Sequence, residues 1–126
     1  MSEHTYTVPL SVQSSMFVGK KPVAVMFGEE ALPTHTWVKV YNTIMQRVIQ
    51  DPIYHDRLME LRNKLAGKVR FFVSDKPDTM RRPLKISEDL YCEVHYGSAT
   101  LMHILVNIIL KAIRYDHSDI KIIIKV

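Results

Sequence analysis

The chain has 126 residues, 47% of them hydrophobic and 24% charged, and its formal net charge at pH 7 is +4. These values exclude a disordered chain and predict a single domain over residues 1–126 with one hydrophobic core. The single cysteine, Cys92, excludes an intramolecular disulfide and fits a reducing compartment. No signal peptide and no membrane-spanning stretch is readable, so we expect a cytoplasmic protein without a membrane partner.

Two strands are predicted at the start of the chain. Apolar residues alternate from Tyr6 to Val12, and Pro9 predicts an edge strand or a strand with a bulge, because proline has no backbone N–H to donate. The apolar run 22–27 predicts a second strand, which ends at Gly28. We expect the two strands to pair as an antiparallel hairpin with a long connection.

Two helices are predicted next. Apolar residues recur at helical spacing over 37–48, and Thr34 or Thr36 is placed to cap the first turn. The Asp-Pro pair at 51–52 supplies a cap and a first helical residue for a second helix. This second helix is expected to continue to a stop at Gly67, because glycine is the residue that most often ends a helix.

The second half of the chain is predicted to contain three strands and one helix. Short strands are predicted at 69–73 and 90–96, separated by a polar loop over 74–83 that holds prolines and arginines. The strongest helical pattern of the chain runs over 99–114 and has a wide apolar face. Alternating isoleucines predict a final strand over 120–126, which we expect to pair inside a sheet.

The predicted order of elements is β-β-α-α-β-β-α-β, with no repeat and no dividing linker. Too few strand–helix–strand units are present for a doubly wound parallel sheet. We therefore expect the α+β class, as a two-layer sandwich in which helices pack on a mixed or mainly antiparallel sheet.

The excess positive charge lies in one central stretch of the chain. From residue 64 to residue 85 there are seven basic residues and two acids. The basic residues are Lys64, Lys68, Arg70, Lys76, Arg81, Arg82 and Lys85. Such side chains neutralise phosphates, and one of Phe71 and Phe72 should face outward, where it is available to stack on bases. The leading interpretation is nucleic-acid binding, and the alternative is an ordinary solvated or protein-contacting surface.

A metal site is the weaker interpretation of the remaining polar residues. The candidate ligands are Cys92, His95, Asp116, His117 and Asp119. Zinc needs three or four converging ligands, but Cys92 and His95 are three positions apart on a predicted strand, so their side chains point to opposite faces. We therefore expect no resident metal, and a zinc-binding protein or a metal-dependent enzyme remains as an alternative.

No catalytic constellation is readable, so we expect a protein that is not an enzyme. Glu93 and His95 share the predicted outward face of a strand, where a surface ion pair is the favoured interpretation and acid–base catalysis the alternative. No nucleophile accompanies them, because Cys92 belongs to the inward face. The four glycines stand alone at predicted turns and form no phosphate-binding loop.

Two stretches of the sequence carry a family resemblance. The first runs over 11–25 and leads into Thr36 and Trp37, and the second runs over 80–86 and leads into 90–96. Together they resemble small accessory proteins of Firmicutes phages and integrative elements, some of which are found beside defence genes. The resemblance covers most of the chain from Ser11 onward, and it implies a mobile genetic element inside a bacterial host cell.

Two roles are implied by this resemblance. One is a module that contacts DNA, and the other is an anti-CRISPR-type inhibitor that binds a host defence nuclease. Many such inhibitors imitate DNA with acidic surfaces, and this basic chain departs from that pattern. The resemblance therefore implies contact with guide RNA, target DNA or an acidic protein surface. The apolar run 16–18 and the third helix are candidate partner or homodimer surfaces, with burial in the core as the alternative.

Overall fold

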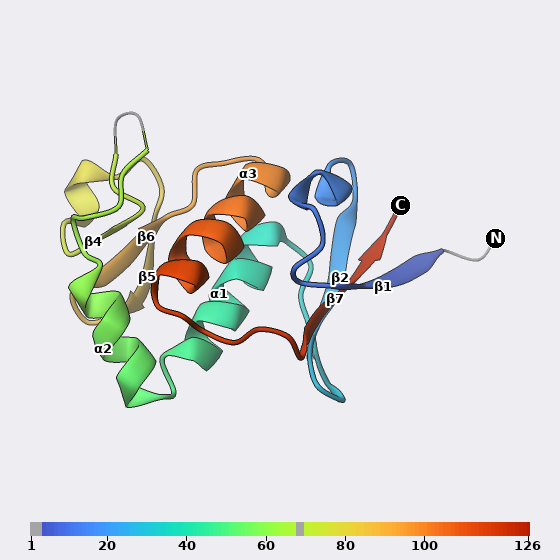
Figure 1. Ribbon diagram of the computed structural model, residues 1–126. Coiled ribbons are helices and arrows are strands. Elements are labelled where there is room, and N and C mark those ends of the chain that lie inside the picture. The colour runs from blue at the N-terminus through green and yellow to red at the C-terminus, as the bar shows by residue number, and fades with distance from the viewer. Residues whose placement is uncertain (1–3, 68–69) are drawn as a thin grey trace.

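Residues 4–67 and 70–126, which the computed structural model describes, form helices that pack against two antiparallel sheets (Figure 1). In chain order the elements are β1 (Thr5–Pro9), the 3-10 helix η1 (Ser14–Phe17), β2 (Lys21–Phe27), β3 (Glu30–Pro33), α1 (Trp37–Val48), α2 (Pro52–Glu60), β4 (Val73–Ser74), the 3-10 helix η2 (Pro77–Thr79), β5 (Pro83–Ser87), β6 (Leu90–Glu93), α3 (Ser98–His103), the π-helix η3 (Ile104–Leu110) and β7 (Ile120–Lys125).

The first sheet has the strand order β1-β7-β2-β3, and every pair in it is antiparallel. β1 lies at the edge, which confirms the position predicted from Pro9, and β7 lies inside the sheet, as its isoleucines predict. The expected hairpin between the first two strands is wrong, because β7 lies between them and pairs with both. The hairpin partner of β2 is β3, a short strand that the sequence analysis did not predict.

Side-chain caps define where the first two helices begin. The Thr36 Oγ1 accepts a hydrogen bond from the Lys39 N–H at 3.1 Å, and an Asp51 carboxylate oxygen accepts one from the Ile53 N–H at 2.9 Å. Both caps agree with prediction. α2 ends at Glu60, well before the predicted stop at Gly67. The chain turns away because Asn63 has a positive φ of 62° and its N–H donates to the Val73 carbonyl at 2.9 Å.

The third helical segment changes its geometry along its length. The sequence predicts one helix over 99–114, and the structure has α3 followed directly by the π-helix η3. In a π-helix each hydrogen bond spans five residues, which widens the turn. The predicted apolar face is buried over most of its length, at Leu101, Ile104, Leu105 and Ile109. Two of its members differ, because Ile108 is half-buried and Ala112 is exposed.

The second sheet has the order β4-β6-β5, and both of its pairs are antiparallel. β5 was not predicted, and its first residue, Pro83, is the last residue of the expected polar loop. β4 shares only Val73 with the strand expected over 69–73, its second residue, Ser74, belongs to the expected loop, and positions 68–69 lie outside the described residues. β6 ends at Glu93, before the predicted end at residue 96.

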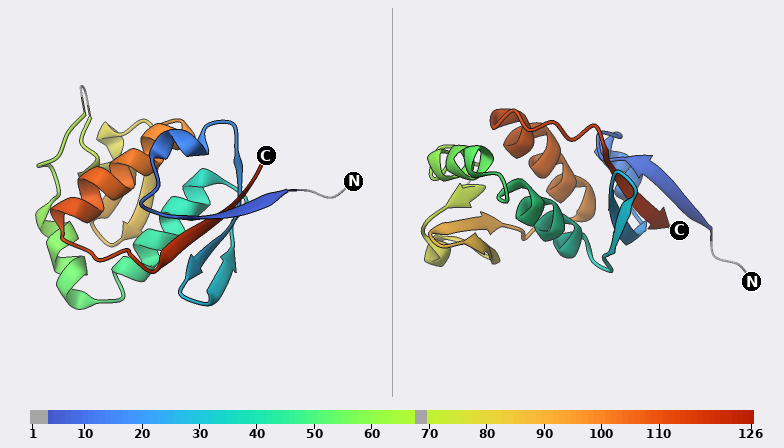
Figure 2. Two further views of the ribbon diagram at one scale, coloured as in Figure 1. Left: turned by 45° about the vertical axis from the view of Figure 1, so that its right-hand side comes forward. Right: turned by 90° about the horizontal axis from the view of Figure 1, so that it is seen from below.

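The α+β class and the mainly antiparallel sheet are confirmed, and the predicted element order is retained with β3 and β5 added. The chain forms two sheets where one was expected. α1 lies between the two sheets and contacts both β2 and β5 (Figure 2). One cluster of buried apolar side chains joins both sheets and the helices. In the described part of the chain, no helix combines the length and the apolar character needed to cross a bilayer.

Candidate nucleic-acid interface around Glu93

Glu93, at the end of β6, is completely buried, with a relative exposure of 0%. The expectation that Glu93 and His95 share an outward face is therefore wrong for Glu93, whereas His95 is exposed. β6 is the central strand of its sheet, and its C-terminal end has neighbours on both sides. The Glu93 N–H donates to the Phe72 carbonyl and the Val94 N–H to the Arg82 carbonyl, each at 3.1 Å.

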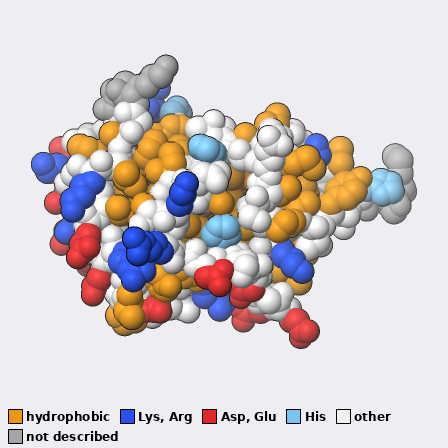
Figure 3. All heavy atoms as spheres, viewed as in Figure 1, with side chains coloured by type: hydrophobic (Ala, Val, Ile, Leu, Met, Phe, Trp, Pro, Cys, Tyr) orange, Lys and Arg blue, Asp and Glu red, His pale blue; other side chains and the backbone are white. Residues whose placement is uncertain are grey.

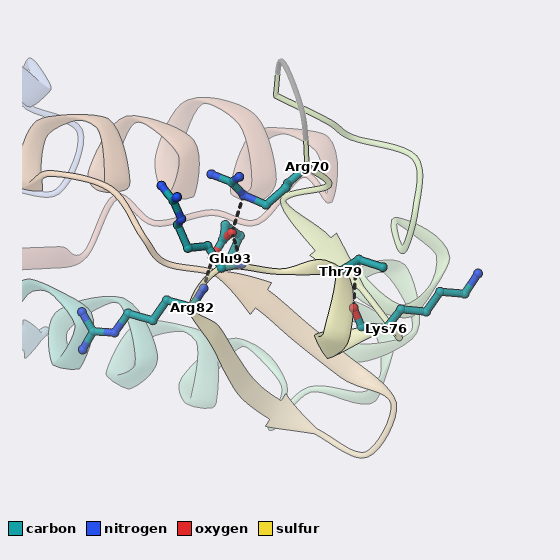
Figure 4. A network of polar contacts seen from close by, with 6 residues as sticks. Arg70, Lys76, Thr79, Arg82 and Glu93 are labelled. Atoms are coloured by element: carbon teal, nitrogen blue, oxygen red, sulfur yellow. Dashed lines mark hydrogen bonds and ion pairs between the residues drawn. The ribbon is translucent and has the colours of Figure 1, made fainter.

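Backbone N–H groups and one guanidinium surround the Glu93 carboxylate (Figure 4). Its Oε1 accepts a hydrogen bond from the Arg81 N–H at 2.8 Å, and its Oε2 accepts one from the Arg82 N–H at 2.8 Å. The Arg70 Nε forms an ion pair with Oε1 at 2.7 Å. A buried charge needs such partners, because an uncompensated carboxylate in the interior is strongly unfavourable.

These contacts keep Glu93 ionised. Burial by itself raises the pKa of the carboxyl group, because it disfavours the charged form. The backbone N–H groups of Arg81, Arg82 and His95, followed by the nearby guanidinium, outweigh burial and hold the pKa of Glu93 below its usual range. The site therefore carries a permanent buried negative charge at neutral pH.

The same contacts fix the backbone of Arg81 and Arg82 and leave both side chains exposed. Within the described residues, no carboxylate forms an ion pair with either guanidinium. Arg82 lines a shallow hollow of about 370 Å³ together with His95, Tyr96 and the backbone around them. Arg82 and His95 thus bring a guanidinium and an imidazole to the lining of this hollow. The N–H groups of both side chains can donate hydrogen bonds to an anion.

The other predicted basic residues are distributed more widely. Arg70 is paired with Glu93, and Lys85 is paired with Glu88 at 2.8 Å. Lys76 points in the opposite direction from Arg82 (Figure 4). Lys64 is exposed in the turn after α2, and Lys68 lies outside the described residues. Of the six basic residues that the structure describes, Arg70, Arg81 and Arg82 lie around Glu93.

Surface chemistry differs between the two ends of the molecule (Figure 3). Lysine and arginine side chains gather over the end that carries α2 and the second sheet, where acidic side chains also lie. Phe71 is 37% exposed and Phe72 is 8% exposed, which confirms that one of the two faces outward. The basic end therefore also presents an aromatic ring to solvent.

The five candidate metal ligands lie apart. Cys92 is fully buried, and burial raises the pKa of its thiol to about 12. His95 is exposed on the opposite face of the same segment, and Asp116, His117 and Asp119 lie in the loop before β7. No group of three histidine, cysteine or acidic side chains converges among the residues that the structure describes.

Sequence reasoning missed Glu93 as the organising residue of the site. The only signal in the sequence is an acid between two apolar residues, Cys92 and Val94, in an alternating strand. Such a pattern normally places the acid in solvent. Its burial depends on Arg70 and on the backbone of the Arg81–Arg82 loop, and none of these is adjacent to Glu93 in sequence.

Comparison of the chain with protein-family models, with curated proteins and with solved structures finds no match. The resemblance to phage accessory proteins therefore stays a prediction.

Proposed function

We propose that this chain is a non-enzymatic nucleic-acid-binding protein, and that Arg81, Arg82 and His95 contact the phosphates. The observation that carries the proposal is the Glu93 carboxylate, which holds the backbone of both arginines while their guanidiniums stay exposed. A loop fixed in this way loses less conformational entropy on binding than a mobile one. Guanidiniums bind phosphate oxygens through paired N–H donors.

Single-stranded nucleic acid is the form that the surface supports best. Proteins that bind single strands combine basic side chains with exposed aromatic rings on which bases stack. Phe71 is exposed and follows Arg70, the third basic residue around Glu93. The Phe72 carbonyl and the Arg82 carbonyl accept hydrogen bonds from consecutive residues, Glu93 and Val94, so the segment that carries Phe71 and the Arg81–Arg82 loop flank the end of β6 on its two sides.

The test is fluorescence anisotropy with labelled single-stranded DNA, single-stranded RNA and duplex DNA at several salt concentrations. For single strands the logarithm of the binding constant should fall linearly with the logarithm of the salt concentration, by about 0.7 for each phosphate contact. We expect the double variant Arg81→Gln/Arg82→Gln to bind more weakly and to show a shallower slope, by about 1.4 if each arginine makes one contact.

The matched control removes two charges elsewhere. Lys111 and Lys121 are both exposed and lie outside the second sheet. The double variant Lys111→Gln/Lys121→Gln should keep nearly the whole salt slope, although it has the same net charge as the arginine variant. Equal slopes for the two double variants would contradict the proposal, because binding would then depend on net charge alone.

A protein partner is the second candidate function, and an exposed apolar patch favours it. Tyr6, Met16 and Val126 are large exposed apolar side chains that line one hollow together with Val8 and Ile124. β1, which carries Tyr6, lies at the end of the molecule opposite to the second sheet (Figure 1). Clustered apolar side chains of this kind mark protein contacts. An anti-CRISPR-type inhibitor of a host defence nuclease, encoded by a mobile genetic element, would use such a patch.

The second candidate predicts a different result from the first. An inhibitor should co-elute with a defence nuclease at moderate salt, and Tyr6→Ser/Met16→Ser should abolish co-elution while Arg81→Gln/Arg82→Gln leaves it intact. Nucleic-acid binding that survives Tyr6→Ser/Met16→Ser but not loss of the two arginines would favour the first candidate.

A further inference from the structure

A second hollow, of about 380 Å³, lies beside the Glu93 site and shares Tyr96 with the hollow that contains Arg82. Its volume lies within the range of small-molecule sites, about 300–1,000 Å³. The wall combines two kinds of side chain. Phe72, Ile104 and Ile108 supply apolar surface, and Arg70, Tyr96 and His103 supply polar groups. Small-molecule sites typically have this mixture of apolar walls and a few polar groups.

Arg70 gives the hollow its charge. Its Nε lies 2.7 Å from the Glu93 Oε1 in an ion pair, without the geometry of a hydrogen bond, and this pair holds the guanidinium beside the carboxylate. The terminal nitrogens point away from Glu93 (Figure 4). A guanidinium has five N–H donors, and within the described residues no acceptor is recorded for the terminal nitrogens of Arg70. The hollow therefore contains a cation with a fixed position and unused donors.

The helical wall of the hollow is also unusual. Ile104 and Ile108 belong to the π-helix η3, and His103 precedes it at the end of α3. π-helical turns are rare and occur frequently at functional sites. Here the wider turn places two isoleucines at the wall of the hollow, and the His103 Nδ1 lies 3.1 Å from the Asn107 amide nitrogen, which limits the motion of the imidazole.

We propose that this hollow binds a small organic acid that has one carboxylate and an apolar body. The carboxylate pairs with the terminal nitrogens of Arg70, and the apolar body lies on Phe72, Ile104 and Ile108. Tyr96 and His103 lie on the same wall and supply further hydrogen-bonding groups. This site uses different side chains from the phosphate contacts at Arg81 and Arg82, so it does not depend on the proposed function.

The test uses octanoate as the probe and the full isotope-labelled chain, followed by backbone amide NMR. Octanol and octylammonium serve as probes of the same length without the negative charge. We expect octanoate to shift the amides of Phe72, Ile104 and Ile108, and to bind about tenfold or more tightly than octanol, as a charge-assisted hydrogen bond implies. Equal affinity for octanoate and octanol, or shifts confined to Tyr6 and Met16, would overturn the proposal.

Two variants separate binding from folding. Ile108→Trp fills the hollow and leaves the pair between Arg70 and Glu93 in place, so we expect a dispersed spectrum and a loss of octanoate affinity of about tenfold or more. If that variant unfolds, Thr100→Trp replaces it, because Thr100 lines the same hollow and is exposed. The control Lys111→Gln should bind octanoate as the unmodified chain does. A folded tryptophan variant with unchanged affinity would contradict the assignment.

Discussion

The two sheets of this molecule are stabilised in different ways. In the first sheet β7 runs through the interior, and Ile120, Ile122 and Ile124 are almost fully buried against the helices. The second sheet is smaller, and its strand β4 has only two residues. Its central strand ends at a buried carboxylate that is held by Arg70 and by two backbone N–H groups.

This difference shows how each region can serve function. Apolar burial has no preferred direction, so it stabilises a sheet without fixing any exposed side chain. The hydrogen bonds that a buried carboxylate accepts are directional, so the carboxylate needs particular donors at hydrogen-bonding distance. In the second sheet these donors belong to the Arg81–Arg82 loop, so the interaction that stabilises the sheet also positions two exposed cations. Both sheets share one apolar core with the helices, so the buried carboxylate is what distinguishes the second sheet.

The largest effect is expected from removal of the buried carboxylate. Glu93→Ala leaves two backbone N–H groups without an acceptor and separates Arg70 from its partner, so we expect a loss of about 3–5 kcal/mol in the free energy of unfolding. Chemical denaturation measures this loss. The control Glu88→Ala removes an exposed acid and should have no measurable effect. A Glu93→Ala variant as stable as the control would show that the carboxylate does not organise the second sheet.

A somewhat smaller effect is expected in the helical core that both sheets share. Ile109 is fully buried, whereas its neighbour Ile108 is half-buried and lines the hollow beside Arg70. Ile109→Ala should lower the free energy of unfolding by about 2–5 kcal/mol, because it leaves a cavity. Ile108→Ala should lower it clearly less. Thermal and chemical unfolding of the two variants checks the order, and a reversed order would contradict the placement of η3.

The smallest expected effect is a difference in pH dependence. Because the pKa of Glu93 is lower in the folded chain than in the unfolded chain, its ionisation stabilises the fold above the unfolded value of about 4.3. This contribution is lost as pH falls through the folded pKa. Glu93→Gln should therefore differ most from the unmodified chain at neutral pH, and the difference should narrow below about pH 4. A difference that stays constant down to acidic pH would contradict the ionised state of Glu93.

Features that depend on neighbouring residues could be predicted correctly from the amino-acid sequence. Alternation over Tyr6 to Val12 and over the last isoleucines predicted two strands of the first sheet, and Pro9 predicted that one of them lies at an edge. Thr36 predicted a helix cap. Each of these depends on local spacing or on the donors of a single residue, so it can be recognised within a few positions of the sequence.

Contacts between segments that are distant in the chain could not be predicted from the sequence, and they are seen only in the folded structure. β7 enters between β1 and β2, although the sequence favoured a direct pairing of those two strands. Glu93 occupies a position that alternation assigns to solvent, and it is buried because Arg70 and the Arg81–Arg82 loop converge on it. The physical reason is the same in both cases: strand order and the pairing of a buried charge depend on partners that are remote in sequence, and no local pattern encodes them.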